Sequence, residues 1–239
     1  MYQINPIISE LQKIANAKKA QILQRFFKTG KGEYGEGDIF LGIVVPEQRK
    51  IAKKYSSLDL MQIQELLNSK IHEERLISLF ILIDKYKKAE KSNDKKQKQE
   101  IVNFYLNNAK NINNWDLVDL SAPNIVGNFL LDKDKSVLYQ LANSENLWEK
   151  RISILATFEF IKNNNFEHTL KLSEILLKDK HDLIHKAVGW MLREVGKRNE
   201  VVLENFLKKH YKEMPRTMLR YAIEKFPENR RKEYLQSKI

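Results

Sequence analysis

The spacing of hydrophobic residues along the chain is helical. Segments 71–86, 146–161 and 182–197 each carry apolar residues at i, i+3, i+4 and i+7, which places them on one face of an α-helix. No stretch alternates hydrophobic and polar residues for long enough to predict a strand. Only eight glycines and five prolines occur, and four of the glycines fall within residues 30–37. The pattern predicts an all-α protein.

A repeat runs through the predicted helices. A basic residue followed by an apolar run recurs four times, and one further segment fills the first gap. The five anchors are Arg75, Asp116, Arg151, Lys186 and Arg220, separated by 41, 35, 35 and 34 residues. This period is typical of a solenoid, because each helix pair buries its apolar face only against its neighbours. We interpret the charged stretch 85–100 as a solvated loop or frayed helix end. The repeat predicts a single solenoid domain over residues 1–239.

The charge of the chain is strongly positive. Lysine and arginine number 42 against 31 acidic residues, a net charge of +11, and +7 of this excess lies within residues 171–239. Such an imbalance is typical of proteins with a polyanionic partner, nucleic acid above all. A composition that is generally rich in lysine and asparagine would give the same excess without any such partner, so charge alone leaves both interpretations open.

Composition also restricts the class of protein. No run approaches the roughly 18 apolar residues of a membrane span, and the first residues lack the pattern of a signal peptide. There is no cysteine, hence no disulfide, thiol nucleophile or thiolate metal site. We expect a cytoplasmic protein without membrane contact.

Two motifs with familiar chemistry are better explained structurally. GKGEYG at 30–35 matches G-x-G-x-x-G, but a dinucleotide site needs flanking strands that this chain does not predict. We expect instead a tight loop whose backbone can approach another group, such as a phosphate. His181 and His185 lie four residues apart, yet a metal site would need a third ligand. We expect neither a cofactor nor a metal.

An acidic residue stands in a segment that otherwise resembles core. Within residues 111–127, Trp115 and Asp119 share a helix face among apolar neighbours. A buried carboxylate is costly unless it is paired or hydrogen-bonded. Asp119 is therefore expected to have a partner or a task. It is either a helix N-cap, which the break at Pro123 favours, or the partner of an arginine from a neighbouring repeat.

Aromatic residues recur in the same repeats. Equivalent helices of a solenoid line one face, so Trp115, Arg151 and Trp190 are candidates to meet on one groove. The alternative is that these two indoles and Trp148 belong to the core, and that Arg151 and Arg193 are solvated surface charges.

Four motifs, in order, carry a resemblance to a known family. They are FLGIVVPEQRK at 40–50, WDLVDLSAPNIVG at 115–127, NLWEKRISI at 146–154 and KAVGWMLREVGK at 186–197. Together they resemble the AlkD-like DNA alkylation repair glycosylases over most of the chain. That family is built from stacked HEAT-like helical repeats with a concave, basic DNA-binding face, in agreement with the period found above.

The resemblance implies an activity and roles for particular residues. It implies hydrolysis of the N-glycosidic bond of N3- or N7-alkylated purines in duplex DNA, for base excision repair, by a monomer that does not extrude the base into a pocket. Asp119 matches the catalytic carboxylate, Trp115 and Trp190 match the catalytic-site aromatics, and Arg151 matches a phosphate-contacting arginine. We expect the Asp119 carboxylate to face an open groove, not a salt-bridging arginine.

Further expectations concern DNA contacts and departures from the family pattern. Lys186, Arg193 and Lys197 are candidates for additional phosphate contacts along the concave face. The family often has an aromatic residue where this chain has Asn114, and loop 30–38 is longer than in some members. Two other functions stay open: a DNA-binding repeat protein without catalytic activity, and a protein-binding solenoid.

Overall fold

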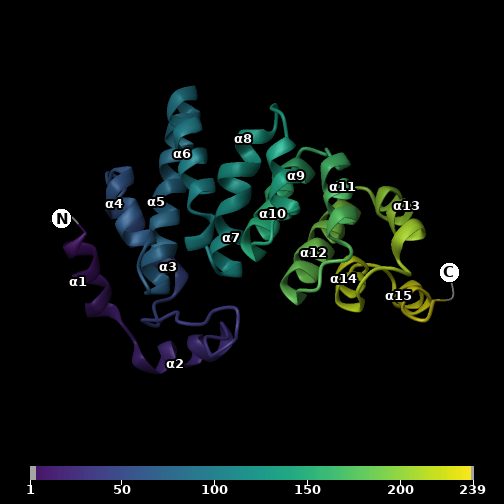
Figure 1. Ribbon diagram of the computed structural model, residues 1–239, viewed down its shortest axis with the longest axis horizontal. Coiled ribbons are helices and arrows are strands. Elements are labelled where there is room, and N and C mark those ends of the chain that lie inside the picture. The colour runs from purple at the N-terminus through teal and green to yellow at the C-terminus, as the bar shows by residue number, and fades with distance from the viewer. Residues whose placement is uncertain (1–3, 238–239) are drawn as a thin grey trace. The chain divides into compact units, whose positions relative to one another are not determined.

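A computed structural model describes residues 4–237 (Figure 1). Within that range helices are joined by turns, and the sole β-type pairing is an isolated bridge between Ile39 and Ile71. The all-α prediction is confirmed. The chain divides into two compact units, Met1–Leu117 and Val118–Ile239, and the boundary falls inside helix α7. Each unit is described by itself below.

Helix α5 is the centre of the first unit. Its residues 76 to 83 are all buried, because α3, α4 and α6 pack around it. The elements of this unit are α1 (Asn5–Ile14), α2 (Ala17–Phe26), α3 (Val45–Lys54), α4 (Leu60–Leu67), α5 (His72–Lys91), α6 (Lys95–Asn107), the short helix η1 (Ala109–Asn111) and the start of α7 (Trp115–Ala122).

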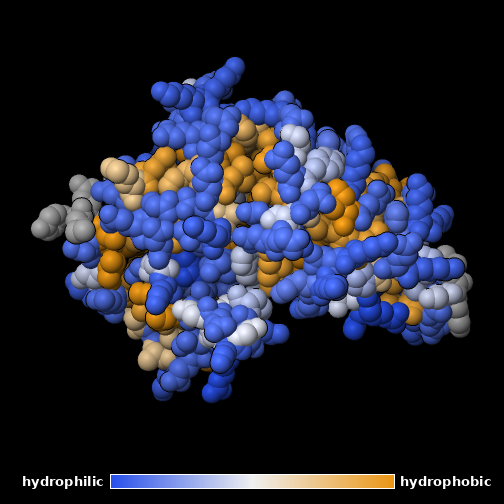
Figure 2. All heavy atoms as spheres, in the orientation of Figure 1, coloured by the Kyte–Doolittle hydropathy of each residue, from blue (hydrophilic) through white to orange (hydrophobic). Residues whose placement is uncertain are grey.

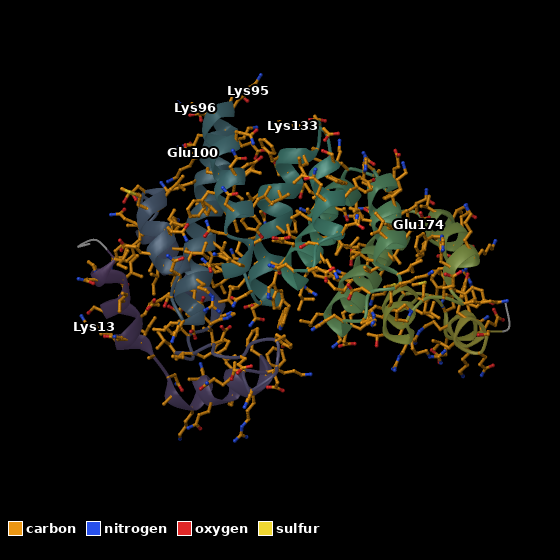
Figure 3. The ribbon with its side chains drawn as sticks, in the orientation of Figure 1. Lys13, Lys95, Lys96, Glu100, Lys133 and Glu174 are labelled. Carbon is orange, nitrogen blue, oxygen red and sulfur yellow. The ribbon has the colours of Figure 1, made fainter. Side chains whose placement is uncertain are left out.

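The charged stretch 85–100 is mostly helical, which corrects its interpretation as a loop. Helix α5 runs to Lys91 and α6 begins at Lys95. The turn between them is tight because Asn93 takes a left-handed conformation and the Asp94 side chain accepts the N–H of Gln97 at 2.9 Å. Figure 3 shows the side chains of Lys95 and Lys96 pointing away from the end of α6. Most of the stretch is exposed, as predicted, but Tyr86 and Ala89 are buried and most of its charges lie on helices.

The second unit repeats a pattern of adjacent long helices. Helix α10 packs against α12, and α12 packs against α14, so helices about 35 residues apart in sequence are neighbours (Figure 1). The elements are the end of α7, the wide turn η2 (Pro123–Gly127), α8 (Asn128–Leu130), α9 (Ser136–Ala142), α10 (Leu147–Lys162), α11 (Glu167–Leu176), α12 (Asp182–Arg198), α13 (Glu200–His210), α14 (Arg216–Ala222) and α15 (Glu228–Leu235).

Polar side chains cover most of the surface in view, and hydrophobic ones show in the hollows between them (Figure 2). Among the described residues, no helix combines the length and the apolar character that crossing a bilayer requires.

Glycine allows two helix backbones of the second unit to touch. A Cβ atom at Gly189 of α12 would lie 2.5 Å from the carbonyl oxygen of Met218 and 2.5 Å from the Cβ of Tyr221, both on α14. Real Cβ atoms do not approach backbone so closely, so α14 would have to move.

We expect Gly189→Ala to lower the free energy of unfolding by about 1–3 kcal/mol, the usual range for overpacking. Urea unfolding followed by circular dichroism measures it. Gly30→Ala is the matched control, since its Cβ would meet only the flexible Glu33 side chain. Equal stability of Gly189→Ala and wild type would show that the two backbones have room to separate.

Candidate functional site

Asp119 of α7 is paired with Arg151 of α10 in the second unit. The guanidinium donates from Nε to Oδ1 and from Nη2 to Oδ2, both at 2.8 Å. This two-point geometry fixes both the position and the plane of the carboxylate. The Asp119 side chain is 13% exposed and that of Arg151 is 5% exposed. The expectation of an unpaired carboxylate facing an open groove is therefore wrong. The alternative, that Asp119 is the partner of an arginine from a neighbouring repeat, is confirmed.

Arg151 also reaches a third helix. Its Nη1 donates to the carbonyl oxygen of Leu183, in the first turn of α12, at 2.6 Å. A buried guanidinium needs such partners, because an unpaired charge removed from water is costly. The three bonds hold α7, α10 and α12 in register around Asp119. A phosphate contact by Arg151 stays a prediction, and it would require the side chain to give up these bonds.

Trp190 lies on α12 and is half-buried. Its Nε1 donates to the Glu194 carboxylate at 3.2 Å, and its ring lies 6.0 Å from that of Phe158, centroid to centroid. Glu194 is nearly buried and also pairs with Lys197 at 2.7 Å. The indole is therefore held by its edge, and part of it remains in contact with solvent. Trp148, by contrast, is buried and belongs to the core.

The basic residues predicted to contact DNA all have acidic partners. Lys186 Nζ lies 2.6 Å from Asp182, Arg193 donates to Glu224, and Lys197 pairs with Glu194. Such partners reduce the positive field that these residues would otherwise project. Their DNA contacts remain predictions.

Trp115 belongs to the first unit, where an aromatic cluster holds it. Its ring stacks on Phe27 with centroids 5.2 Å apart and planes 15° apart, and the ring of Phe26 meets it edge-on at 6.0 Å. Phe27 stacks in turn on Phe40. Trp115 is partly buried against this cluster. Since Trp115 and Trp190 belong to different units, their convergence on one groove stays a prediction.

A buried histidine contacts the Phe27 and Phe40 rings of that cluster. His72 of α5 is 2% exposed, and its Nε2 lies 2.9 Å from Asp116 while its Nδ1 lies 3.3 Å from Asp38. Burial opposes protonation of the ring, but the charge and hydrogen bond of Asp116 and the bond to Asp38 outweigh it and raise the pKa of His72 to about 9. His72 is therefore an imidazolium at neutral pH, clamped between two carboxylates.

The same carboxylates organise the start of α7. Asp38 also pairs with Arg75 at 2.7 Å, and burial, which raises its pKa, is outweighed by His72 and Arg75, so the pKa of Asp38 is lowered. Asn114 is buried, donates to Asp38 at 3.3 Å and accepts the N–H of Trp115 at 2.8 Å. An aromatic residue could not make these bonds, which gives a physical reason for the departure at Asn114.

The motif at residues 40–50 has a structural role. The Glu73 carboxylate, at the start of α5, accepts the backbone N–H groups of Leu41, Gly42 and Ile43 at 2.8–3.2 Å. Gly42 is required there, because its φ is +78° and a Cβ would lie 2.2 Å from the Asn16 carbonyl oxygen. The motif thus anchors α2 to α5.

The glycine-rich loop and the histidine pair singled out in the sequence both make local hydrogen bonds within the fold. In loop 30–38 the N–H groups of Gly30 and Gly32 donate to the carboxylates of Glu33 and Glu36, which take the places that we expected a phosphate to occupy. His181 accepts the N–H of Leu183, and His185 bonds the Asp179 carbonyl oxygen. Within residues 4–237, no group of three or more potential ligands is arranged to hold a metal ion.

The His72 network was not predicted from the sequence. Four ionisable residues in succession, HEER at 72–75, directly precede a buried apolar run. Charges at that place need partners from elsewhere in the chain, and this was the available signal. The partners Asp38 and Asp116 lie 34 and 44 residues away in sequence, so the pattern could not identify them.

Comparisons with known proteins establish the family and support the fold. A family model described as "DNA alkylation repair enzyme" matches residues 7–226. Among solved structures, a predicted DNA alkylation repair enzyme from Enterococcus faecalis is similar with a TM-score of 0.70 and 16% identity, over 90% of this chain and 97% of that one. AlkD2 from Streptococcus mutans is similar with a TM-score of 0.55 and 18% identity, over 88% and 98%. At these identities the structures support the fold alone. No curated protein matches the chain.

Proposed function

Because the chain belongs to the DNA alkylation repair enzyme family, we propose that it is a monofunctional DNA glycosylase acting on N3- or N7-alkylated purines, such as 3-methyladenine and 7-methylguanine, in duplex DNA. The observation that carries the proposal is the Asp119–Arg151 pair. It offers a carboxylate of fixed orientation, partly exposed, on a scaffold of three helices.

The chemistry suits such a carboxylate. An N3- or N7-alkylated purine is cationic and leaves as a neutral base, so little acid catalysis is needed. Positive charge then grows on C1′ and the ring oxygen of the deoxyribose as the C–N bond breaks. A preorganised anion stabilises that charge in the transition state and positions a water. The water adds to C1′ and releases a proton, which leaves an abasic site.

Arg151 has a positioning role in this proposal. Each of its two bonds to Asp119 uses one acceptor position of a carboxylate that has about four. The guanidinium therefore fixes the orientation of the Asp119 carboxylate.

Trp115 and Trp190 are assigned to binding the electron-poor purine and sugar. Both indoles are half-buried, each held on one side by protein contacts. An indole face attracts a cation with about 0.5–2 kcal/mol. Since neither the Asp119 carboxylate nor the indoles require a base to enter a deep cavity, base extrusion is not part of the proposal.

The test is release of base from methylated duplex DNA by the purified protein, followed by chromatography of free 7-methylguanine and 3-methyladenine. We expect both to be released and abasic sites to accumulate without strand cleavage. A DNA-binding protein without catalytic activity is the second candidate, because a buried Asp–Arg pair is also a structural device. Binding of methylated DNA without release of either base would establish that second function.

A further inference from the structure

The repeated basic position differs in character along the chain. Arg75 and Arg151 are buried and paired with Asp38 and Asp119. Lys186 is partly exposed and pairs with Asp182. Arg220, the last of the series, is exposed, and its guanidinium makes no hydrogen bond or ion pair with another described residue. At the first two positions the guanidinium is bound within the fold, whereas Arg220 has its charge available to a ligand.

Arg220 lines an open pocket in the second unit. The pocket has a volume of about 370 Å³ and is bordered by Thr217, Arg220, Tyr221, Glu224 and Arg231, from α14, the turn that follows it and α15. Two guanidinium groups and two hydroxyl-bearing side chains therefore surround one space. The set is rich in hydrogen-bond donors.

The second arginine is only partly satisfied. Arg231 donates from Nη1 to Glu228 at 2.8 Å, but its Nε is buried and has no hydrogen-bond partner. A buried donor without an acceptor is uncommon and costly. The one carboxylate in the lining, Glu224, already pairs with Arg193 and Lys225, which moderate its charge. The pocket thus keeps a net positive character.

We propose that this pocket binds a phosphate group, and that in the DNA complex the group is a phosphodiester of the backbone. This rests on the proposed function, in that it names a further contact to the same DNA. Planar guanidinium groups match phosphate oxygens in a two-point geometry. Glu224 disfavours a doubly charged free phosphate more than a singly charged diester, which selects the backbone as the source.

The experiment measures duplex DNA affinity as a function of salt for wild type, Arg220→Ala and the control Lys232→Ala. Lys232 is an exposed cation on α15 outside the pocket lining, so its loss removes the same charge from the same unit. We expect Arg220→Ala to bind undamaged and methylated duplexes alike about tenfold more weakly, with a shallower salt slope by about one. Lys232→Ala should change both quantities much less. Arg220→Ala should unfold at the wild-type temperature, since its side chain has no partner to lose.

In a second experiment, inorganic phosphate is titrated into wild type and Arg220→Ala, and the arginine Nε–H signals are followed by NMR. Phosphate shifts that Arg220→Ala abolishes, with unchanged DNA affinity, would assign the pocket to free phosphate and overturn the backbone assignment. Unchanged DNA affinity with no phosphate response would overturn the site altogether. Base release is measured separately, so a protein that binds DNA through Arg220 but releases no base refutes only the glycosylase.

Discussion

Substitution of Asp119 by asparagine is expected to slow the release of 7-methylguanine from duplex DNA by about 10²–10³-fold, with DNA affinity unchanged or higher. Asparagine keeps the size of the side chain but removes the negative charge that, in the proposed mechanism, faces the developing sugar cation. Affinity does not fall, because the lost carboxylate would otherwise repel the phosphate backbone. Single-turnover release at saturating protein measures the rate, and fluorescence anisotropy measures the affinity.

The control for this prediction is Arg151→Gln. Breaking the buried pair from either side costs stability, about 3–5 kcal/mol, because one charge is left without its partner. Both variants are therefore compared at a temperature where circular dichroism shows each to be folded. If Asp119 is catalytic, Asp119→Asn releases base more slowly than Arg151→Gln does. If the pair is purely structural, the two variants release base at equal rates. A wild-type rate for Asp119→Asn would remove that residue from the mechanism.

The salt dependence of Arg151→Gln separates two roles for the arginine. Its guanidinium is bonded to Asp119 and to the Leu183 carbonyl oxygen and is almost fully buried. If Arg151 only positions Asp119, the slope of DNA affinity against salt stays at the wild-type value. A slope shallower by about one would show instead that Arg151 contacts a phosphate.

Raising the pH from 7 to 10 is expected to destabilise the protein through His72. Its pKa is raised to about 9 in the folded state, from about 6.5 when unfolded. The folded state therefore holds this proton more tightly. The stabilisation is complete below pH 6.5, declines by about 1.4 kcal/mol per pH unit above it, and is lost above pH 9, for a total of roughly 3 kcal/mol.

Urea unfolding at a series of pH values measures this effect, and two variants isolate it. His72→Gln should lose about 3–5 kcal/mol at pH 7, since Asp38 and Asp116 stay buried without the imidazolium, and should lose the decline between pH 6.5 and 9. His168→Gln is the control. Burial lowers the pKa of His168, so that group affects stability only under acidic conditions. An alkaline decline that persists in His72→Gln would assign the effect to another group.

The fold was largely predictable because its determinants are local. Apolar spacing identified the helices at 71–86, 146–161 and 182–197, and the steps of about 35 residues matched the neighbouring helices α10, α12 and α14. The error at 85–100 has a physical cause. Lysine and glutamine favour helix as well as solvent, so a polar stretch does not by itself predict a loop.

Both residues of the Asp119–Arg151 pair could be singled out from the sequence, but their pairing could not be predicted from it. Asp119 and Arg151 stood out from their surroundings, and an ion pair between repeats was one of two alternatives. Which alternative holds depends on how α7 and α10 are placed. Asp119 and Arg151 are 32 residues apart, and no sequence pattern indicates that they are in contact. The acidic partners of Lys186 and Lys197 lie within four residues of them and could have been read from the helix spacing.

The contact at Gly189 has a consequence for how this sequence can vary in evolution. The backbones of α12 and α14 meet there without a side chain between them, and the space at position 189 is taken by the carbonyl of Met218 and the Cβ of Tyr221. No smaller residue at 218 or 221 removes those two atoms, except glycine at 221, which removes one of them. No single side-chain change therefore compensates fully for a larger residue at position 189, and a homologue with such a residue must hold α14 farther from α12.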